Sequence, residues 1–225
     1  MAALSLRHLD CLAEISRQAL DRLADRDWCD EVYLAGSAAL ALYCGHRPVE
    51  DLDLMSQVNR LTGAHRRDLL HDLLEMDPGA RVETARDGFL HLRLARGPTL
   101  RFFYYPYPLV DPERWLGGVA VASPLDLGLM KIAAIISRGS RRDFVDLFLL
   151  CREFPLEAIL ERAEDKFGHV RDFPLQALKG LADLSLVAGD PMPRLTRTLD
   201  WKDVETWLAA EVRRLGRRHV GLEAR

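Results

Sequence analysis

Two aspartates with one residue between them, Asp51 and Asp53, are the side chains in this sequence most suited to chemistry. They lie in a stretch, Glu50 to Met55, that indicates a strand. Because strand side chains alternate between two faces, both carboxylates project to the same side. Like charges this close repel unless a cation lies between them, and hard oxygen ligands suit Mg²⁺, completed by substrate phosphates and water. The pair predicts a magnesium site, with a solvated Asp-x-Asp at a loop end as the alternative.

A second feature, Gly36-Ser37, lies about fifteen residues before the aspartates. Residues 31–35 have the β-branched and aromatic content of a short strand, and a helix is predicted from Ala38 to its end at Gly45. A tight turn at the start of a helix presents backbone N–H groups to a phosphate, and glycine allows that phosphate to come close. Gly36 and Ser37 are therefore predicted to bind phosphate.

The elements around these features must hold them in place. Apolar residues at helical spacing in 4–28 and 60–76 predict two long amphipathic helices. Between residues 81 and 105 the apolar period changes to two, with turns at Asp87-Gly88 and Arg96-Gly97-Pro98. This pattern predicts an antiparallel meander that extends the sheet of the two aspartates, and residues 119–122 predict one more short strand.

The chain after Ser123-Pro124 is predicted to be helical, since this dipeptide is typical of an N-cap followed by proline in the first helical turn. Five helices are expected there, at 125–137, 141–151, 156–167, 175–187 and 201–215. The predicted fold class is α/β (α+β), with a mixed sheet flanked by helices. We expect two domains, an α/β domain at 1–122 and a helical C-terminal domain at 123–225.

Three charged residues of the helical half are further site candidates. Lys131 lies among apolar neighbours, where a lysine either extends its ammonium to water or meets phosphate oxygens as a point charge. Asp143 stands near the start of the next helix, where it can complement the helix dipole. Asp146, one turn later, is the stronger candidate for a catalytic carboxylate.

Composition limits the classes of function. The 225 residues carry a formal charge of −3, so a basic field over the whole molecule is absent and only a local patch could bind nucleic acid. The basic end of the last helix, Arg213 to Arg218, is either a solvated helix terminus or an RNA contact. The N-terminal residues resemble no signal peptide and no apolar run could span a bilayer, so we expect a cytoplasmic protein that does not bind membranes.

The four cysteines, at 11, 29, 44 and 151, have no paired Cys-x-x-Cys spacing. His65, His71 and His91 also fall into no ligand pattern with them. Free buried thiols and surface histidines are the expectation.

Two blocks of this sequence resemble a known family. The first runs from Gly36-Ser37 through Gly45-His46-Arg47 to Asp51-Leu-Asp53, and the second holds Lys131, Arg138, Asp143 and Asp146. Together they resemble the AbiEii/AbiGii toxin branch of the nucleotidyltransferase superfamily, whose fold is the minimal polymerase-β-like domain. The two blocks span roughly residues 31 to 150.

The resemblance implies a metal-dependent transfer of a nucleotidyl group from an NTP to an acceptor, with tRNA as the expected acceptor. It further implies the toxin of a toxin–antitoxin or phage-defence pair, and hence an antitoxin protein as partner. The implied roles are triphosphate binding by Gly36, Ser37 and Arg47, Mg²⁺ binding by Asp51 and Asp53, charge stabilisation by Lys131, and orientation or deprotonation of the acceptor hydroxyl by Asp146 or, as second choice, Asp143.

One departure from the superfamily pattern keeps a rival open. Many nucleotidyltransferases carry a third metal-binding carboxylate on a strand like 99–105, but this strand contains none and has Arg101 at its middle. Glu83 is the nearest substitute. The alternatives are a catalytically degenerate module that binds a nucleotide or a protein, and an enzyme whose acceptor is a small molecule or a protein side chain.

Overall fold

Alternating apolar residues build one mixed sheet in residues 7–219, the part of the chain that this computed structural model describes. Its seven strands lie in the order β3-β4-β5-β2-β1-β7-β6. Their bounds are β1 (Tyr33–Ala35), β2 (Leu52–Ser56), β3 (Arg81–Arg86), β4 (Phe89–Arg93), β5 (Thr99–Tyr104), β6 (Arg114–Leu116) and β7 (Val119–Val121). Strand β2 pairs antiparallel with β1 and parallel with β5, and β3, β4 and β5 form the predicted antiparallel meander.

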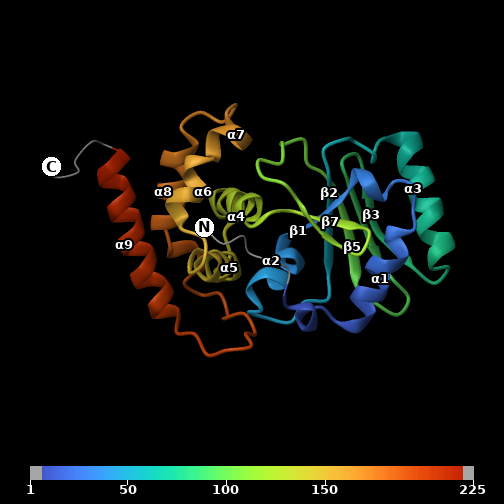
Figure 1. The fold of residues 1–225 in the computed structure, drawn as a ribbon, viewed down its shortest axis with the longest axis horizontal. Coiled ribbons are helices and arrows are strands. Elements are labelled where there is room, and N and C mark those ends of the chain that lie inside the picture. The colour runs from blue at the N-terminus through green and yellow to red at the C-terminus, as the bar shows by residue number, and fades with distance from the viewer. Residues whose placement is uncertain (1–6, 220–225) are drawn as a thin grey trace. The chain divides into compact units, whose positions relative to one another are not determined.

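The chain forms two compact units, Met1–Ser123 and Pro124–Arg225, each with its own core. The first holds the sheet and three helices of the described residues, α1 (Glu14–Ala24), α2 (Gly36–Cys44) and α3 (Gly63–Met76). The second, within the described residues, is helical, with α4 (Pro124–Arg138), α5 (Arg141–Cys151), α6 (Leu156–Glu161), α7 (Ala163–Phe167), α8 (Phe173–Ala182) and α9 (Trp201–His219). Figure 1 draws these elements, and the α/β fold class predicted from the sequence is confirmed.

One face of the sheet in the first unit is apolar and covered. Leu54 of β2 and Phe102 of β5 are buried neighbours on it. The Trp28 ring meets Phe102 edge-on, with 5.8 Å between ring centroids, and its Nε1–H donates to Asp72 Oδ2 of α3 at 3.0 Å. Helix α3 therefore lies over this face, because Leu69, Leu73 and Met76 are its buried side.

Three local predictions differ from the structure. The first predicted helix is interrupted, because Leu12 forms a bridge with Val49 and only a 3₁₀ turn (Leu9–Cys11) precedes α1; residues 4–6 of that prediction lie outside the described residues. Strand β6 was not predicted, and it arises because Gly117, at φ +59°, turns the chain into a hairpin with β7.

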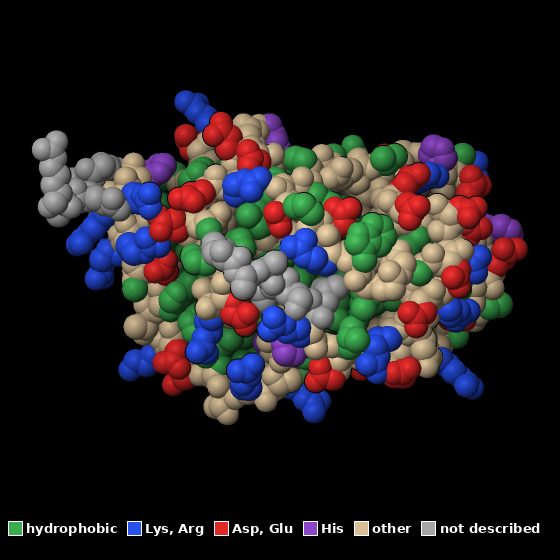
Figure 2. Space-filling view, viewed as in Figure 1, with side chains coloured by type: hydrophobic (Ala, Val, Ile, Leu, Met, Phe, Trp, Pro, Cys, Tyr) green, Lys and Arg blue, Asp and Glu red, His purple; other side chains and the backbone are tan. Residues whose placement is uncertain are grey.

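The predicted helix 156–167 is two short helices, α6 and α7. Helix α8 ends at Ala182 and a 3₁₀ turn follows at Ser185–Val187, with a further one at Cys29–Glu31 ahead of β1. On the face of the molecule that Figure 2 presents, acidic and basic side chains are interspersed, as the near-balanced composition predicts. Among residues 7–219, the helices are all too short or too polar to cross a bilayer.

Candidate active site

The turn from β1 into α2 lies directly beside Asp53. Ala35 of β1 is in register with Asp53 of β2, and the next residue, Gly36, begins α2 with φ +61°. A Cβ atom at Gly36 would lie 2.4 Å from Asp53 Oδ2 and 3.1 Å from its Cγ. Only glycine allows the carboxylate to come this close to the start of the helix.

A guanidinium faces the two carboxylates in the same sheet. Arg101 of β5 is the register partner of Asp53, so both side chains lie on one face. The Arg101 Nε–H donates to Asp53 Oδ1 at 2.6 Å, and Arg101 Nη2 lies 4.0 Å from Asp51 Oδ2. The cation that the sequence requires between the aspartates is thus supplied, in this structure, by the chain itself.

The segment that leads into β2 is fixed from two sides. Ser16 of α1 is fully buried, and its hydroxyl donates to the carbonyl oxygen of Glu50 at 2.7 Å. Val49 N–H donates to the Cys11 carbonyl at 2.8 Å. On the β5 side, Thr99 N–H donates to Asp51 Oδ1 at 3.3 Å. Neighbours on both sides therefore hold the backbone and carboxylate of Asp51 in place.

The remaining first-unit candidates lie at different depths. Ser37 is half-buried in the first turn of α2, whereas Arg47 is only 7% exposed in the loop between α2 and β2. Glu83 lies on β3, which is separated from β2 by the two strands β4 and β5, and it faces Arg93 at 3.5 Å. Glu83 is therefore no substitute for a third carboxylate beside the aspartates.

In the second unit, Lys131 lies between both predicted carboxylates. Its Nζ is 2.9 Å from Asp143 Oδ1 and 2.7 Å from Asp146 Oδ2. The lysine side chain is 9% exposed, that of Asp143 6%, and that of Asp146 0%. The alternative in which Lys131 extends to water is therefore not what the structure shows, since the ammonium is buried and doubly paired.

Charge, not burial, decides the protonation of this cluster. Burial alone lowers the pKa of Lys131, but attraction by Asp146 and Asp143 and their hydrogen bonds outweigh it and raise the pKa above its ordinary value. Burial raises the pKa of Asp143, but the charge of Lys131 and the hydrogen bonds from Ser140 and Lys131 lower it on balance. The lysine is thus a buried ammonium held by carboxylates.

Asp143 also caps the first turn of α5, near the helix start as its position in the sequence suggested. Ser140 and Asp143 form a capping box, in which Ser140 N–H and its hydroxyl both donate to Asp143 Oδ2, at 3.2 and 2.7 Å. One carboxylate oxygen caps the helix and the other accepts from Lys131. Asp143 therefore fixes the start of α5 relative to Lys131 of α4.

The donor set on β2 fits a divalent cation only in part. Among residues 7–219, no group of three or more His, Cys, Asp or Glu side chains is arranged to hold a metal. Two carboxylates that approach the same guanidinium, Asp53 on β2 and Asp51 just before it, are nevertheless a sufficient protein contribution for Mg²⁺, which takes its remaining ligands from substrate phosphates and water. Asp51 and Asp53 thus fit a metal that arrives together with a nucleotide.

Residues 18–206 match the family model described as "Nucleotidyl transferase AbiEii toxin, Type IV TA system". The chain belongs to the AbiEii nucleotidyltransferase toxin family. An uncharacterized protein of Aquifex aeolicus (strain VF5) is 32% identical to this AbiEii protein over 171 residues, which cover 73% of this chain and 79% of that protein.

Two solved structures share the fold of this AbiEii protein at low identity. JHP933 from Helicobacter pylori is 18% identical with a TM-score of 0.53, covering 93% of this chain and 90% of that one. MenT4, a nucleotidyltransferase toxin from Mycobacterium tuberculosis H37Rv, is 15% identical with a TM-score of 0.54, covering 88% and 82%. The nucleotidyltransferase assignment made from the sequence motifs is confirmed.

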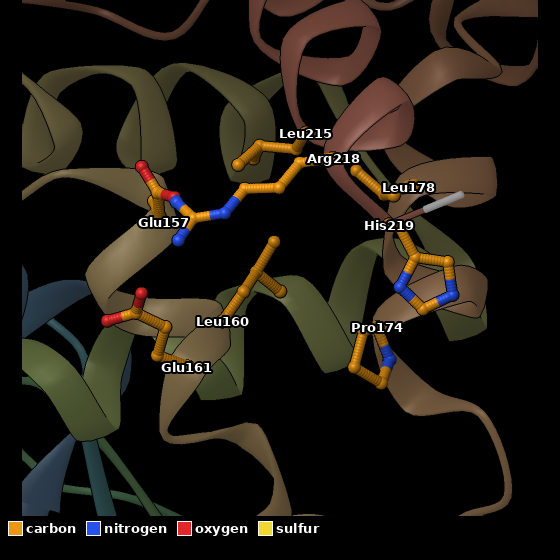
Figure 3. A pocket seen from close by; sticks show the side chains of 8 residues that line it. All are labelled: Glu157, Leu160, Glu161, Pro174, Leu178, Leu215, Arg218 and His219. Carbon is orange, nitrogen blue, oxygen red and sulfur yellow. The ribbon is translucent and has the colours of Figure 1, made fainter. Parts of the chain in front are cut away.

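The basic end of α9 has a structural partner in this AbiEii protein. Arg214 Nη1 lies 2.9 Å from Glu157 Oε2 on α6, and Arg218 pairs with the same carboxylate. Figure 3 shows the Arg218 guanidinium beside Glu157 at the rim of a pocket of about 270 Å³. Two of the arginines that suggested an RNA contact therefore hold α9 against α6.

Sequence reasoning missed two features of this AbiEii protein. Arg101 was interpreted only as the residue that replaces a carboxylate. Its spacing of two from Thr99 and from Phe103 in an alternating strand indicates that the three side chains lie on one face. Lys166 and Asp126 form an ion pair at 2.8 Å with both side chains 0% exposed. The two residues are forty positions apart, and this spacing does not predict that they pair.

Proposed function

We propose that this AbiEii protein transfers a nucleotidyl group from an NTP, bound with Mg²⁺, to a hydroxyl group of tRNA. The observation that carries the proposal is the contact between the Asp53 carboxylate and the Gly36 turn at the start of α2. The carboxylate that we assign to the metal and the turn that we assign to phosphate are thereby adjacent, as the transfer of a phosphate-linked group requires. Family membership favours this enzyme over a degenerate binding module.

Asp51 and Asp53 would hold the metal through oxygens on one face of β2. A bound Mg²⁺ would supply positive charge that offsets the negative charge developing on the phosphates. Arg101 has two tasks in this proposal. It stabilises the paired carboxylates before substrate arrives, and its guanidinium would donate to a phosphate oxygen when the nucleotide is bound.

The triphosphate would be held by the backbone N–H groups and hydroxyl at Gly36 and Ser37, at the positive end of α2. Arg47 would add a buried positive charge, since its side chain lies at 7% exposure in the loop between α2 and β2. The acceptor oxygen then forms a bond to the α-phosphorus while the bond to pyrophosphate breaks, and the hydroxyl proton goes to water. Catalysis of this kind depends mainly on positioning and charge.

Lys131 would stabilise charge on the phosphates as a point charge. An ammonium has three donors, and two are directed at Asp143 and Asp146. The third suits a phosphate oxygen. Because Asp146 has no exposed surface, we assign it, unlike the sequence-based hypothesis, to positioning Lys131 and not to the acceptor hydroxyl.

The cellular role in this proposal is that of a cytoplasmic toxin. It follows from the family description, which names a type IV toxin–antitoxin system, and it implies an antitoxin that counteracts the enzyme. A small helix-turn-helix protein encoded beside this gene would support that role. A nucleotidyl group added to tRNA would interfere with translation, as a toxin must interfere with some essential process.

The direct test offers the protein each α-labelled NTP with Mg²⁺ and total RNA, and asks which molecule becomes labelled. We expect label in tRNA with one preferred NTP. Asp53→Asn should abolish Mg²⁺-dependent NTP binding, whereas Glu83→Gln, an equal charge change three strands away on β3, should leave it intact. If the label appears in a small molecule or a protein, that molecule and not tRNA is the acceptor. An equal loss of NTP binding in both variants would contradict the assigned metal site.

A further inference from the structure

The face of the sheet that carries Asp53 and Arg101 continues across β4 and β3 as a basic and aromatic surface. Register places His91 beside Arg101, Phe89 beside Phe103, and Arg86 beside Phe89. Arg93 pairs with Thr99 on the same face, and Arg81 with Arg93. We call this surface the arginine face; its members are Arg81, Arg86, Phe89, His91, Arg93, Arg101 and Phe103.

These side chains are accessible, in contrast to the opposite face. Arg81, Arg86 and Arg93 are exposed, and the other members are partly exposed. Their strand neighbours Leu90, Leu92 and Leu100 have no exposed surface. The alternation expected of a strand with one solvated face is therefore present, but the solvated side carries arginines and phenylalanines in place of mixed small polar residues.

The charge of the arginine face differs from that of the whole chain. Strands β3, β4 and β5 hold four arginines and a single acid, Glu83, whereas the chain has a net charge of −3. Arg101 is paired with Asp53, whereas Glu83 meets Arg93 at 3.5 Å with side chains 44% and 57% exposed, which makes a weak pair. The positive charge available to a ligand therefore comes from Arg81, Arg86 and Arg93 on β3 and β4. The local patch that the composition could not reveal lies here.

The aromatic members offer stacking surface. The Phe89 and Phe103 rings lie with centroids 5.0 Å apart, and the Arg86 guanidinium lies over the Phe89 ring at 5.2 Å. Proteins that bind single-stranded nucleic acid combine such rings, which stack on bases, with cations that follow the phosphates. A duplex hides its base faces and cannot use the rings.

We infer that the arginine face binds a single-stranded stretch of the acceptor RNA and leads its reactive end toward Asp53. This inference rests on the proposed function. Three strand spacings of about 4.8 Å separate β3 from β2, so the path is about 14 Å long and ends at the aspartates. The arginines would pair with phosphates, and Phe89 and Phe103 would stack on bases.

The test measures binding of a fluorescein-labelled single-stranded RNA oligonucleotide by fluorescence anisotropy, at several salt concentrations and without NTP. The test variant is Arg81→Ala with Arg86→Ala. The matched control is Arg22→Ala with Arg67→Ala, which removes two exposed arginines from helices α1 and α3 of the same unit. Thermal unfolding checks that each variant folds.

We expect the test variant to bind about tenfold more weakly or worse at low salt, and to lower the slope of log K against log salt by about 1.4, or 0.7 for each lost phosphate contact. The control should keep both values. Phe89→Leu should weaken binding at least about fivefold, the low end of one lost stacking contact, without changing the slope. The same RNA in a duplex should bind less tightly.

Equal losses in the test and control variants would overturn the inference, as would equal affinity for duplex and single strand. Binding of Mg·NTP, measured on the same samples, separates this inference from the proposed function. If the protein binds NTP normally but does not bind RNA, only the RNA-binding role of the arginine face is overturned. An acidic protein partner would then be the expected ligand of this surface. If the unmodified protein does not bind NTP, the proposed function itself is contradicted.

Discussion

Gly36 is held in a conformation that other residues adopt only with strain. Its φ of +61° costs an L-residue about 1–2 kcal/mol, and a Cβ would also displace the Asp53 carboxylate, 2.4 Å away. We expect Gly36→Ala to destabilise the protein by about 1–3 kcal/mol and to slow nucleotidyl transfer on the order of 10²-fold, because Asp53 moves.

Gly63 provides the control for Gly36. It begins α3 with ordinary φ, and an added Cβ would meet nothing within 4 Å. Gly63→Ala should therefore be neutral or stabilise by up to about 1 kcal/mol, through the lower entropy of the unfolded chain. Chemical denaturation gives the free energies of unfolding, and equal effects of the two substitutions would contradict the special role of Gly36.

In the proposed function, Arg101 would compete with a metal for the aspartates before substrate arrives. We expect Arg101→Ala to tighten Mn²⁺ binding to the nucleotide-free protein roughly 30-fold, since a unit charge about 4 Å from a divalent ion would oppose its binding by about 2 kcal/mol even in water. Electron paramagnetic resonance of free Mn²⁺ measures the affinity. Arg93→Ala, on the neighbouring strand, is the control, and unchanged affinity in Arg101→Ala would place the metal away from Asp51 and Asp53.

At the scale of elements, α4 and α5 are joined through Lys131. The positioning role assigned to Asp146 predicts that Asp146→Asn behaves like Lys131→Ala, with both NTP affinity and transfer rate reduced. A base acting on the acceptor would instead keep NTP affinity and lose about 10²–10⁴ in rate. Separate measurement of NTP affinity and single-turnover rate decides between these outcomes.

The same two helices should respond to acid through Asp143. Because its pKa is lowered from the ordinary 3.8, Asp143 contributes stability that is present above that value and is lost as the pH falls below it. Asp143→Asn should therefore unfold more easily than the unmodified protein by on the order of 2–4 kcal/mol at neutral pH, a difference that shrinks below pH 4. Urea unfolding from pH 2.5 to 7 follows it, and a constant difference would argue against the ion pair.

At the scale of the whole molecule, two units with separate cores should give two unfolding transitions.

The buried pair of Lys166 and Asp126 allows the second unit to be perturbed alone. Burial lowers the pKa of Lys166 more than Asp126 raises it, so the charged lysine depends on Asp126. Lys166→Met leaves Asp126 buried without its cation and should destabilise that unit by about 3–5 kcal/mol. Calorimetry should show one transition lowered and the other unchanged, and adding Asp126→Leu should restore most of the loss.

The sequence predicted what depends on local spacing. Strand alternation placed Asp51 and Asp53 on one face, and the glycine-containing turn placed a helix start nearby. Local spacing did not predict the pairing between distant segments. The parallel register of β2 with β5 brings Arg101 to Asp53, and the packing of α4 on α5 buries Lys131. Such contacts depend on which strands and helices become neighbours, and local propensity does not encode that choice.

The pairing of Asp53 with Arg101 spans 48 residues, and Asp146 follows later still. Synthesis runs from the N-terminus at about 5–20 residues per second, and domains fold as they emerge, so roughly 7 to 30 s pass before the last of these groups leaves the ribosome. The residues that the proposed function assigns to the metal are therefore made first, and Asp146, assigned to positioning Lys131, is made last. Under the proposed function, a chain that has not yet reached Asp146 lacks an assigned residue, and a partly made toxin should therefore be inactive on the ribosome that is translating it.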